Sequence, residues 1–285
     1  MIRRFKSGAA VWHKIENDPK ALLFLRSREL YCVAASARFL SNSGSYDHAW
    51  SLQDGRGRII ALLIHSKRSF FPVFNSRLDI PIPRFMDRFL RKIALHAIQG
   101  LQREVEVLET GLIPLGVVPA EQIDYDLMAL DRLPNTNSLS KGPQKLVLRR
   151  PTGSDIEALF PLQAGYEQEE VLPTGAVFNP ASCRLSLEHI IANEQILIAE
   201  LEGRILGKIN TNAESFSRYQ IGGVYILPEY RGLGIGSRLT AAFVRDIVIA
   251  GKGVSLFVKK QNLAARIVYR RIGFISLEDY RITYY

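Results

Sequence analysis

The 285-residue sequence predicts a mixed α+β protein made of two domains. Short apolar segments of strand length alternate with longer segments of helical periodicity along the chain. A stretch from Leu133 to Pro143 that is poor in apolar residues and rich in turn formers divides them. We therefore predict an N-terminal domain over residues 1–131, a linker over 132–145 and a C-terminal domain over 146–285.

The composition is that of a soluble globular protein, with 47% hydrophobic and 23% charged residues. The longest purely apolar runs, such as Ile59 to Ile64, have the length of a core strand and are too short to span a membrane. The basic start is not followed by an apolar stretch of signal-peptide length, since Ser7, Gly8 and His13 interrupt it. We expect a cytoplasmic protein with no membrane partner.

The formal net charge of +9 favours polyanionic partners. The cationic residues are spread along the chain, so the charge leaves open a solvated surface, a nucleic acid or ribosome, and a small polyanionic ligand. Cys32 and Cys183 stand far apart, without the spacing of metal ligands, and the five histidines are scattered. We expect two reduced cysteines and no metal site.

In the N-terminal half, Asn17 and Asp18 precede a helix that Pro19 opens and that extends to about Leu30. Strands over 46–53 and 58–65 flank the turn sequence Asp54-Gly-Arg-Gly and form a predicted hairpin. The other expected elements are a strand over 69–75, a helix from Pro83 with Phe85, Met86, Phe89, Leu90 and Ile93 on one face, a strand over 95–99, a helix ending near Gly111, and a strand over 123–130.

The C-terminal half repeats this order. Its expected elements are a strand over 145–150, helices over 154–163, 166–171 and 182–193, a hairpin of strands 195–201 and 205–213, a strand over 219–227, a helix over 232–250, a strand over 254–258, a helix over 261–272, and one or two strands over 276–285. The shared order indicates a duplicated architecture. In the N-terminal half, Asn75-Ser-Arg-Leu-Asp-Ile-Pro stands where the C-terminal half has a glycine loop, so we interpret that half as a degenerate copy without a phosphate site.

The glycine-rich loop from Arg231 to Ser237 is the most informative segment. Pro228 ends the preceding strand, and the glycines allow a tight turn that presents several N–H groups inward. The start of the following helix adds unpaired donors and the positive end of the helix dipole. Such a loop can hold a pyrophosphate.

Two common nucleotide-binding loops do not fit this segment. A P-loop requires Gly-Lys-Ser/Thr, whereas Gly236 is followed by Ser237 and Arg238. A Rossmann loop requires GxGxxG after an early strand, whereas Gly232-Leu-Gly-Ile-Gly has another spacing and lies late in the chain.

The segment Arg231-Gly-Leu-Gly-Ile-Gly resembles the Arg/Gln-x-x-Gly-x-Gly/Ala signature of the GCN5-related N-acetyltransferase (GNAT) superfamily. Residues 262–274 match its second motif, Asn-x-x-Ala-x-x-x-Tyr-x-x-x-Gly-Phe, at every named position. On a helix this spacing places Ala265 and Tyr269 on one face and lets Gly273 end the helix. The resemblance covers about Leu146 to Tyr285 and extends to a little-characterised bacterial branch with an extra N-terminal domain.

The resemblance implies the GNAT fold, in which a mostly antiparallel sheet splays between its fourth and fifth strands and acetyl-CoA lies in the wedge. It implies that Tyr269 is the general acid that protonates the leaving thiolate, and that a backbone N–H near Ile226 stabilises the oxyanion. The implied acetyl-CoA-binding residues are Val224, Tyr225 and Ile226 for pantetheine, Arg231, Gly232, Leu233, Gly234, Ile235, Gly236 and Ser237 for the pyrophosphate, and Asn262.

The general base is left open. Many members of the superfamily use a Glu, a His or a water at the fourth strand, but the strand over 219–227 contains neither Glu nor His. Glu169 and Glu170 are tentative candidates on the acceptor side, against the alternative of a solvated helix face. Tyr219 and Tyr225 are further candidates.

The strand over 205–213 carries a second polar pattern, since Lys208, Asn210 and Asn212 alternate with other residues and share one face. That face either hydrogen-bonds an acceptor or faces solvent.

We expect an acetyl-CoA-dependent N-acetyltransferase in which an amine, on a small molecule or a peptide end, attacks the thioester directly. One alternative is an acyl-CoA-binding or sensing protein with little turnover, because the fourth strand lacks a base. Another, suggested by charge alone, is an RNA- or ribosome-associated modifier. The sequence leaves open the acceptor, the role of the N-terminal domain, and whether the protein forms a homodimer.

Overall fold

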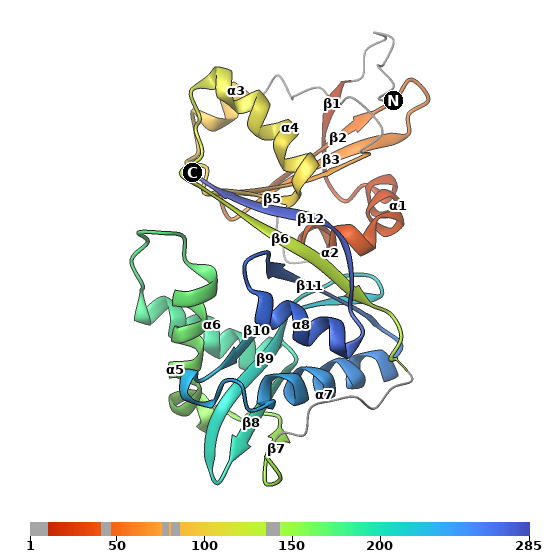
Figure 1. Cartoon of the computed structure of the whole chain (residues 1–285). Coiled ribbons are helices and arrows are strands. Elements are labelled where there is room, and N and C mark those ends of the chain that lie inside the picture. Colours follow the sequence, from red (N-terminus) through yellow and green to blue (C-terminus); the bar gives the residue numbers. More distant parts are fainter. Residues whose placement is uncertain (1–10, 41–46, 76–79, 81–85, 135–142) are drawn as a thin grey trace. The chain divides into compact units, whose positions relative to one another are not determined.

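The computed structural model describes residues 11–40, 47–75, 80, 86–134 and 143–285 (Figure 1). These form two compact units, and each is described separately. The N-terminal unit comprises Met1–Leu127 with Leu277–Tyr285, and the C-terminal unit comprises Met128–Ser276. The sequence analysis kept residues 277–285 with the C-terminal domain, whereas the structure groups them with the N-terminal unit. Most of the expected linker lies outside the described residues.

The N-terminal unit contains the hairpin, third strand, helix, strand, helix and strand expected from the sequence. Its elements are β1 (Trp12–Ile15), α1 (Pro19–Ser27), a 3₁₀ turn (Glu29–Tyr31), α2 (Val33–Leu40), β2 (His48–Gln53), β3 (Ile59–Ser66), β4 (Ser69–Phe74), α3 (Met86–Leu90), β5 (Ala97–Leu101), α4 (Gln102–Leu112), a 3₁₀ turn (Ile113–Leu115) and β6 (Glu121–Leu130). As predicted, Asp18 caps α1, accepting a hydrogen bond of 2.8 Å from the N–H of Lys20.

Three elements of this unit differ from the expectation. The sequence analysis did not predict β1 or α2, which are only 4 and 8 residues long. The helix expected from Pro83 is described only as the short α3, because residues 81–85 lie outside the described part of the chain.

The N-terminal sheet includes a strand from the other end of the sequence, which lies between β5 and β6. Strands β1 to β4 pair in antiparallel order, and β4 pairs with β5 in parallel. On the other side of β5 lies β12 (Ile275–Tyr284), antiparallel, with Tyr280 opposite Leu101 and Tyr284 opposite Ala97. Tyr280 is only 3% exposed, so this last strand is an integral part of the unit's core.

The C-terminal unit has the same order of elements. They are β7 (Val147–Arg149), a 3₁₀ turn (Gly153–Asp155), α5 (Ile156–Tyr166), a π turn (Glu167–Val171), α6 (Pro180–Asn193), β8 (Ile196–Leu201), β9 (Arg204–Glu214), β10 (Arg218–Ile226), a 3₁₀ turn (Pro228–Tyr230), α7 (Ile235–Ile249), β11 (Gly253–Lys259) and α8 (Leu263–Ile272). The duplicated architecture is therefore present in the structure.

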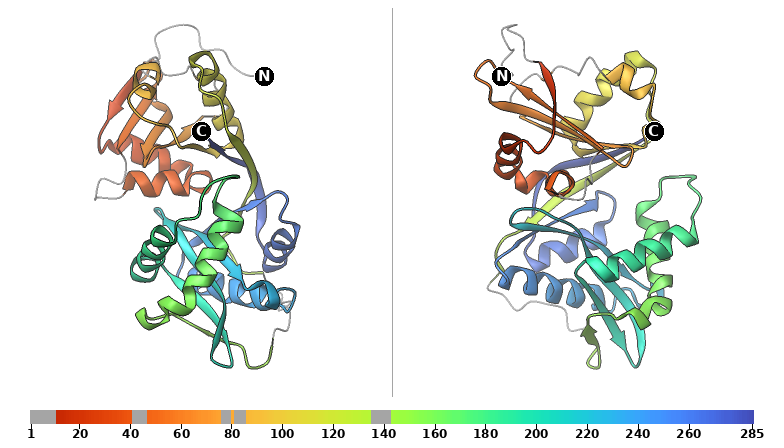
Figure 2. Two further views of the ribbon diagram at one scale, coloured as in Figure 1. Left: turned by 90° about the vertical axis from the view of Figure 1, so that its left-hand side faces the viewer. Right: turned by 180° about the vertical axis from the view of Figure 1, so that it is seen from behind.

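The C-terminal sheet is splayed, as predicted. Strands β7 to β10 pair in antiparallel order, whereas β10 pairs with β11 in parallel only from Arg218 to Ile221. Helices α5 and α6 cover one face of β8 to β10, and α7 and α8 lie on the other (Figure 2). The part of β10 beyond Ile221 therefore borders a wedge.

Candidate active site

The end of β10 presents backbone groups to the wedge. The N–H of Leu227 bonds to the carbonyl of Leu206 on β9 at 2.9 Å. Backbone groups alternate in direction along an antiparallel strand, so those of Tyr225 also face β9, and those of Val224 and Ile226 face the opposite side, where β11 has separated. Such a strand edge can pair with an extended ligand.

The glycine loop then opens α7 without a side-chain cap. Gly234 occupies the N-cap position with φ of 78° and ψ of 0°, in the left-handed region that favours glycine. The helical hydrogen bonds begin with the N–H of Arg238, which bonds to the carbonyl of Gly234 at 3.0 Å. The N–H groups of Ile235, Gly236 and Ser237 precede that bond and, with the helix dipole, form an anion-binding end.

The wedge's other side is α8, whose side chains follow the predicted motif. Asn262 caps the helix, with its Oδ1 accepting from the N–H of Ala265 at 3.1 Å. Tyr269 lies on the inner face and is 7% exposed. Burial raises the pKa of its hydroxyl, and the nearby Tyr166 and Glu170 raise it further. Tyr269 is therefore protonated at neutral pH and can donate a proton or a hydrogen bond.

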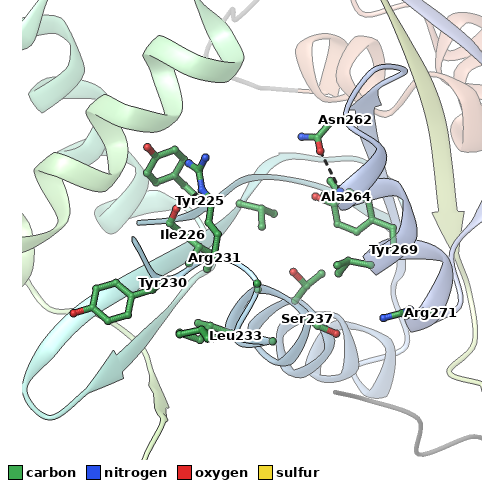
Figure 3. A pocket seen from close by; sticks show the side chains of 18 of the residues that line it. Tyr225, Ile226, Tyr230, Arg231, Leu233, Ser237, Asn262, Ala264, Tyr269 and Arg271 are labelled. Atoms are coloured by element: carbon green, nitrogen blue, oxygen red, sulfur yellow. Dashed lines mark hydrogen bonds between the residues drawn. The ribbon is translucent and has the colours of Figure 1, made fainter. Parts of the chain in front are cut away.

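These elements surround one cavity of about 710 Å³. Figure 3 shows Tyr225 and Arg231 on one side of it and Asn262 and Tyr269 on the other. The proposed general acid, the acetyl-CoA-binding residues and the two tentative glutamate bases all line this cavity: Glu169, Glu170, Val224, Tyr225, Ile226, Arg231, Gly232, Leu233, Gly234, Ile235, Gly236, Ser237, Asn262 and Tyr269. The geometry brings them together, and their chemical roles stay a proposal.

Thr240 is a lining residue that the sequence analysis missed. It lies on α7 one turn after Ser237, and its side chain is fully buried. Within the described part of the chain, no group hydrogen-bonds to its hydroxyl. The sequence could have indicated Thr240, because its i, i+3 spacing from Ser237 places the two hydroxyls on the same helix face. Other lining residues are Tyr230, Ala264, Ala265, Val268 and Arg271.

Glu169 belongs to a hydrogen-bonded cluster at the cavity. Its Oε1 accepts from the Tyr225 hydroxyl at 2.6 Å, and its Oε2 accepts from Nη2 of Arg231 at 2.9 Å. Partial burial alone would raise the pKa of Glu169, but the hydrogen bonds from Tyr225 and Arg231 outweigh it and lower that pKa. Burial and Glu169 in turn raise the pKa of Tyr225 to about 12. The lowered pKa makes Glu169 a weak base, and the raised pKa keeps the Tyr225 hydroxyl protonated at neutral pH, so neither residue is suited to accept a proton.

Glu170 faces the other side of the wedge. Its Oε1 lies 3.3 Å from Nδ2 of Asn262, and its Oε2 lies 3.3 Å from Nζ of Lys259. Its charge is close enough to raise the pKa of Tyr269. The π turn therefore directs Glu169 toward β10 and Glu170 toward β11 and α8.

The polar face of β9 neither lines the cavity nor faces solvent as a whole. Lys208 and Asn210 are 0% and 2% exposed, while Asn212 is exposed. Both buried side chains lie against the bulge of β10, a possibility that the sequence analysis did not consider. Tyr219, another candidate base, does not line the cavity.

In the residues that the structure describes, no group of three His, Cys, Asp or Glu side chains could hold a metal ion. The helices of the same residues are too short or too polar to cross a bilayer. Cys32 and Cys183 are buried free thiols. The cytoplasmic location and a nucleic-acid partner stay predictions from the sequence.

Residues 162–274 match the model of the acetyltransferase (GNAT) family. None of the curated proteins matches the chain. Three similar solved structures are a Drosophila protein (11% identity, TM-score 0.63, covering 97% of this chain and 99% of that one), a tandem GNAT protein from the clavulanic acid biosynthesis pathway (11%, 0.57, 96% and 98%), and a GCN5-related N-acetyltransferase from Sphaerobacter thermophilus (17%, 0.56, 95% and 94%).

At such identities the likeness shows the fold alone, but it extends over nearly the whole of each chain. The tandem protein matches over both units of this chain, in agreement with their shared order of elements. Residues 162–274 therefore form a domain of the acetyltransferase (GNAT) family, and the unit that precedes it has a GNAT-like fold.

Proposed function

We propose that the protein transfers an acetyl group from acetyl-CoA to an amine on a small molecule or a peptide end. The observation that carries this proposal is the cavity in which the open edge of β10, the uncapped start of α7 and the buried hydroxyl of Tyr269 meet. The family supports acyl transfer in general. The choice of acetyl donor and amine acceptor is our inference.

The lining of the cavity supports a binding site for each part of acetyl-CoA. The backbone groups of Val224 and the N–H of Ile226 would pair with the amide groups of the pantetheine arm, whereas the carbonyl of Ile226 already accepts from Nε of Arg231 at 3.0 Å. The N–H groups from Arg231 to Ser237 would hold the pyrophosphate at the start of α7. Asn262 fixes the start of α8 at the other wall.

The proposed reaction is a direct attack. The nitrogen of a neutral amine forms a bond to the thioester carbonyl carbon, the C–S bond breaks, and the thiolate takes the proton of Tyr269. A backbone N–H of β10 that faces the wedge, at Val224 or Ile226, stabilises the negative oxygen in between. The amine nitrogen gives one proton to a base, which releases it to solvent, and Tyr269 takes one proton back from solvent, so that in net terms one proton moves from the amine to the thiolate.

Between the two tentative bases, the geometry favours Glu170. Glu169 is held at 2.6 Å and 2.9 Å by Tyr225 and Arg231, and these bonds lower its pKa. The contacts of Glu170 are longer, at 3.3 Å, and its charge acts on Tyr269. We propose Glu170 as the proton acceptor and Glu169 as the residue that holds Arg231 beside the glycine loop.

The test is to incubate the protein with acetyl-CoA and a panel of amines and peptides, and to follow the free thiol and the acetylated product. We expect thiol release that depends on one class of amine. Tight binding of acetyl-CoA without amine-dependent thiol release would instead support an acyl-CoA-binding protein. Nucleic acid that remains bound through purification, seen in the ratio of absorbance at two wavelengths, would support an RNA-associated modifier.

A further inference from the structure

Strand β10 contains a bulge directly before the residues that face the wedge. Gly222 is opposite Asn210 and Tyr225 is opposite Lys208, so β10 has one residue more than β9 across this interval. Gly223 has φ of 58°, and a Cβ placed on it would lie 1.9 Å from Oδ1 of Asn210. Glycine is therefore required here by both backbone conformation and space.

Side chains satisfy the backbone groups of Gly223 that the bulge removes from the sheet. Its carbonyl accepts a hydrogen bond of 3.1 Å from Nζ of Lys208. Its N–H bonds to the hydroxyl of Tyr166, at the end of α5. Buried backbone groups need such partners, so Lys208 and Tyr166 replace the missing sheet bonds of the bulge.

The same side chains close a ring of hydrogen bonds. Nζ of Lys208 also donates to Oδ1 of Asn210 at 2.9 Å, and Nδ2 of Asn210 donates to Oδ1 of Asn212 at 3.0 Å. The side chain of Asn212 bonds to the Tyr166 hydroxyl, which returns to Gly223. Each member therefore limits the movement of the next.

The Lys208 side chain carries an amino group into a buried position, where a positive charge is unfavourable. The residue is fully buried, 5.1 Å above the ring of Tyr166. Burial lowers the pKa of Lys208 to about 7, although Glu167 and Cys183 nearby favour the charged form. An apolar side chain of similar length would avoid this desolvation but would leave the carbonyl of Gly223 without its donor.

We propose that Lys208 is a positioning residue for acyl transfer, which sets the direction of the Val224 N–H through the carbonyl of Gly223. The two groups belong to one planar trans peptide, so they point in opposite directions. A carbonyl fixed toward Lys208 fixes the Val224 N–H toward the wedge, where the thioester oxygen would lie. The inference rests on the proposed function only for this last step.

The experiment compares wild-type protein with Lys208→Met, which keeps the length of the side chain and removes its donors. We expect kcat for acetyl transfer to fall about 10- to 100-fold, less than the roughly 100- to 1,000-fold loss that follows removal of an oxyanion donor, because the Val224 N–H is misdirected and not removed. The Kd of acetyl-CoA should stay within about threefold, because the glycine loop is untouched. Amide hydrogen exchange at Val224 should become faster. Cys183→Ala is the matched control, since Cys183 is buried beside Lys208 but outside the ring.

Tyr166→Phe removes the other anchor of Gly223 and carries the test if Lys208→Met does not fold. Exchange at Val224 should become faster in this variant too. In the double variant, the effect on exchange should be smaller than the sum of the two single effects. Unchanged exchange at Val224 in a folded variant, or a loss of acetyl-CoA affinity that equals the loss in kcat, overturns the proposal. The exchange measurement needs no turnover, so it stays decisive if wild-type protein acetylates no amine.

Discussion

The two units follow the same order of elements, and their described residues differ at the connection after the fourth strand of each. In the C-terminal unit, β10 leads through glycines into α7, a helix of 15 residues whose N-cap is Gly234. In the N-terminal unit, the helix that follows β4 is α3, with 5 residues and a buried Met86. The N–H groups at the start of α7 follow directly from the turn at Gly234, whereas most residues between β4 and α3 lie outside the described part of the chain. The connection into α7 is the one to which the proposed function assigns the pyrophosphate.

The corresponding last helices differ as well. Helix α8 begins at Asn262, whose side chain caps it, and carries Tyr269 on its inner face. Helix α4 follows Leu101, which has no side-chain cap, and its sequence contains no tyrosine. Helix α4 therefore has no counterpart of the capping Asn262 or of Tyr269 in α8.

The largest expected effect concerns β12, the C-terminal strand, which pairs with β5 in the N-terminal unit. Tyr280→Ala should destabilise the N-terminal unit by about 3–5 kcal/mol, because Tyr280 is buried on a strand that pairs with β5, and alanine would leave a cavity there. Native-state amide exchange along β5 measures it. Ile275→Ala, at 63% exposure in the part of β12 that belongs to the C-terminal unit, should change stability by less than about 0.5 kcal/mol and leave exchange along β5 unchanged. Faster exchange in β8 or β9 but not in β5 would contradict the grouping of Tyr280 with the N-terminal unit.

This strand also shows which features a sequence can predict. The loop from Arg231 to Ser237 and the helix from Asn262 to Phe274 are contiguous, so residue types and spacing identified them before the structure. The pairing of Tyr280 with Leu101 joins residues far apart in the chain, and local periodicity contains no information on such pairing. The same limit applies to Lys208, since an alternating polar pattern is typical of an exposed face and does not reveal a bulge in the neighbouring strand.

The second prediction concerns the tyrosine that α4 lacks. Tyr269→Phe should lower amine-dependent thiol release about 100-fold, because it removes the proton donor, while the Kd of acetyl-CoA stays within about twofold. Steady-state kinetics and calorimetric titration measure the two quantities. Tyr280→Phe is the control, since it removes a buried hydroxyl from the N-terminal unit and should leave turnover unchanged. Equal turnover in Tyr269→Phe and wild type would remove Tyr269 from the mechanism.

The third prediction is an opposite pH response of the two units. Glu104 is buried, and burial raises its pKa to about 7 against the opposing effects of Arg28 and the Phe74 N–H. Because the folded state binds this proton more tightly than the unfolded state, the stabilisation is complete below about pH 4.5 and is lost as pH rises through about 7. In the C-terminal unit, hydrogen bonds from Arg149 lower the pKa of Asp155, so its contribution is lost only in acid.

Exchange of α4 amides between pH 5 and pH 8, corrected for intrinsic rates, should show the N-terminal unit losing on the order of 2 kcal/mol. Glu104→Gln should abolish this slope, because glutamine does not titrate. Asp155→Asn should leave the slope unchanged. A slope that survives in Glu104→Gln would assign it to another group.

The smallest expected effect compares two glycines in the same backbone conformation. Gly234 has φ of 78° and Gly116, after α4, has φ of 73°. Valine at either position should cost its unit about 1–2 kcal/mol of stability, because a β-branched residue is strained in the left-handed region. Only Gly234→Val should also weaken acetyl-CoA binding, by about tenfold or about 1.4 kcal/mol, since its strain changes the start of α7. Equal affinities in Gly234→Val and Gly116→Val would mean that the glycine loop is a structural turn and that acetyl-CoA is held elsewhere.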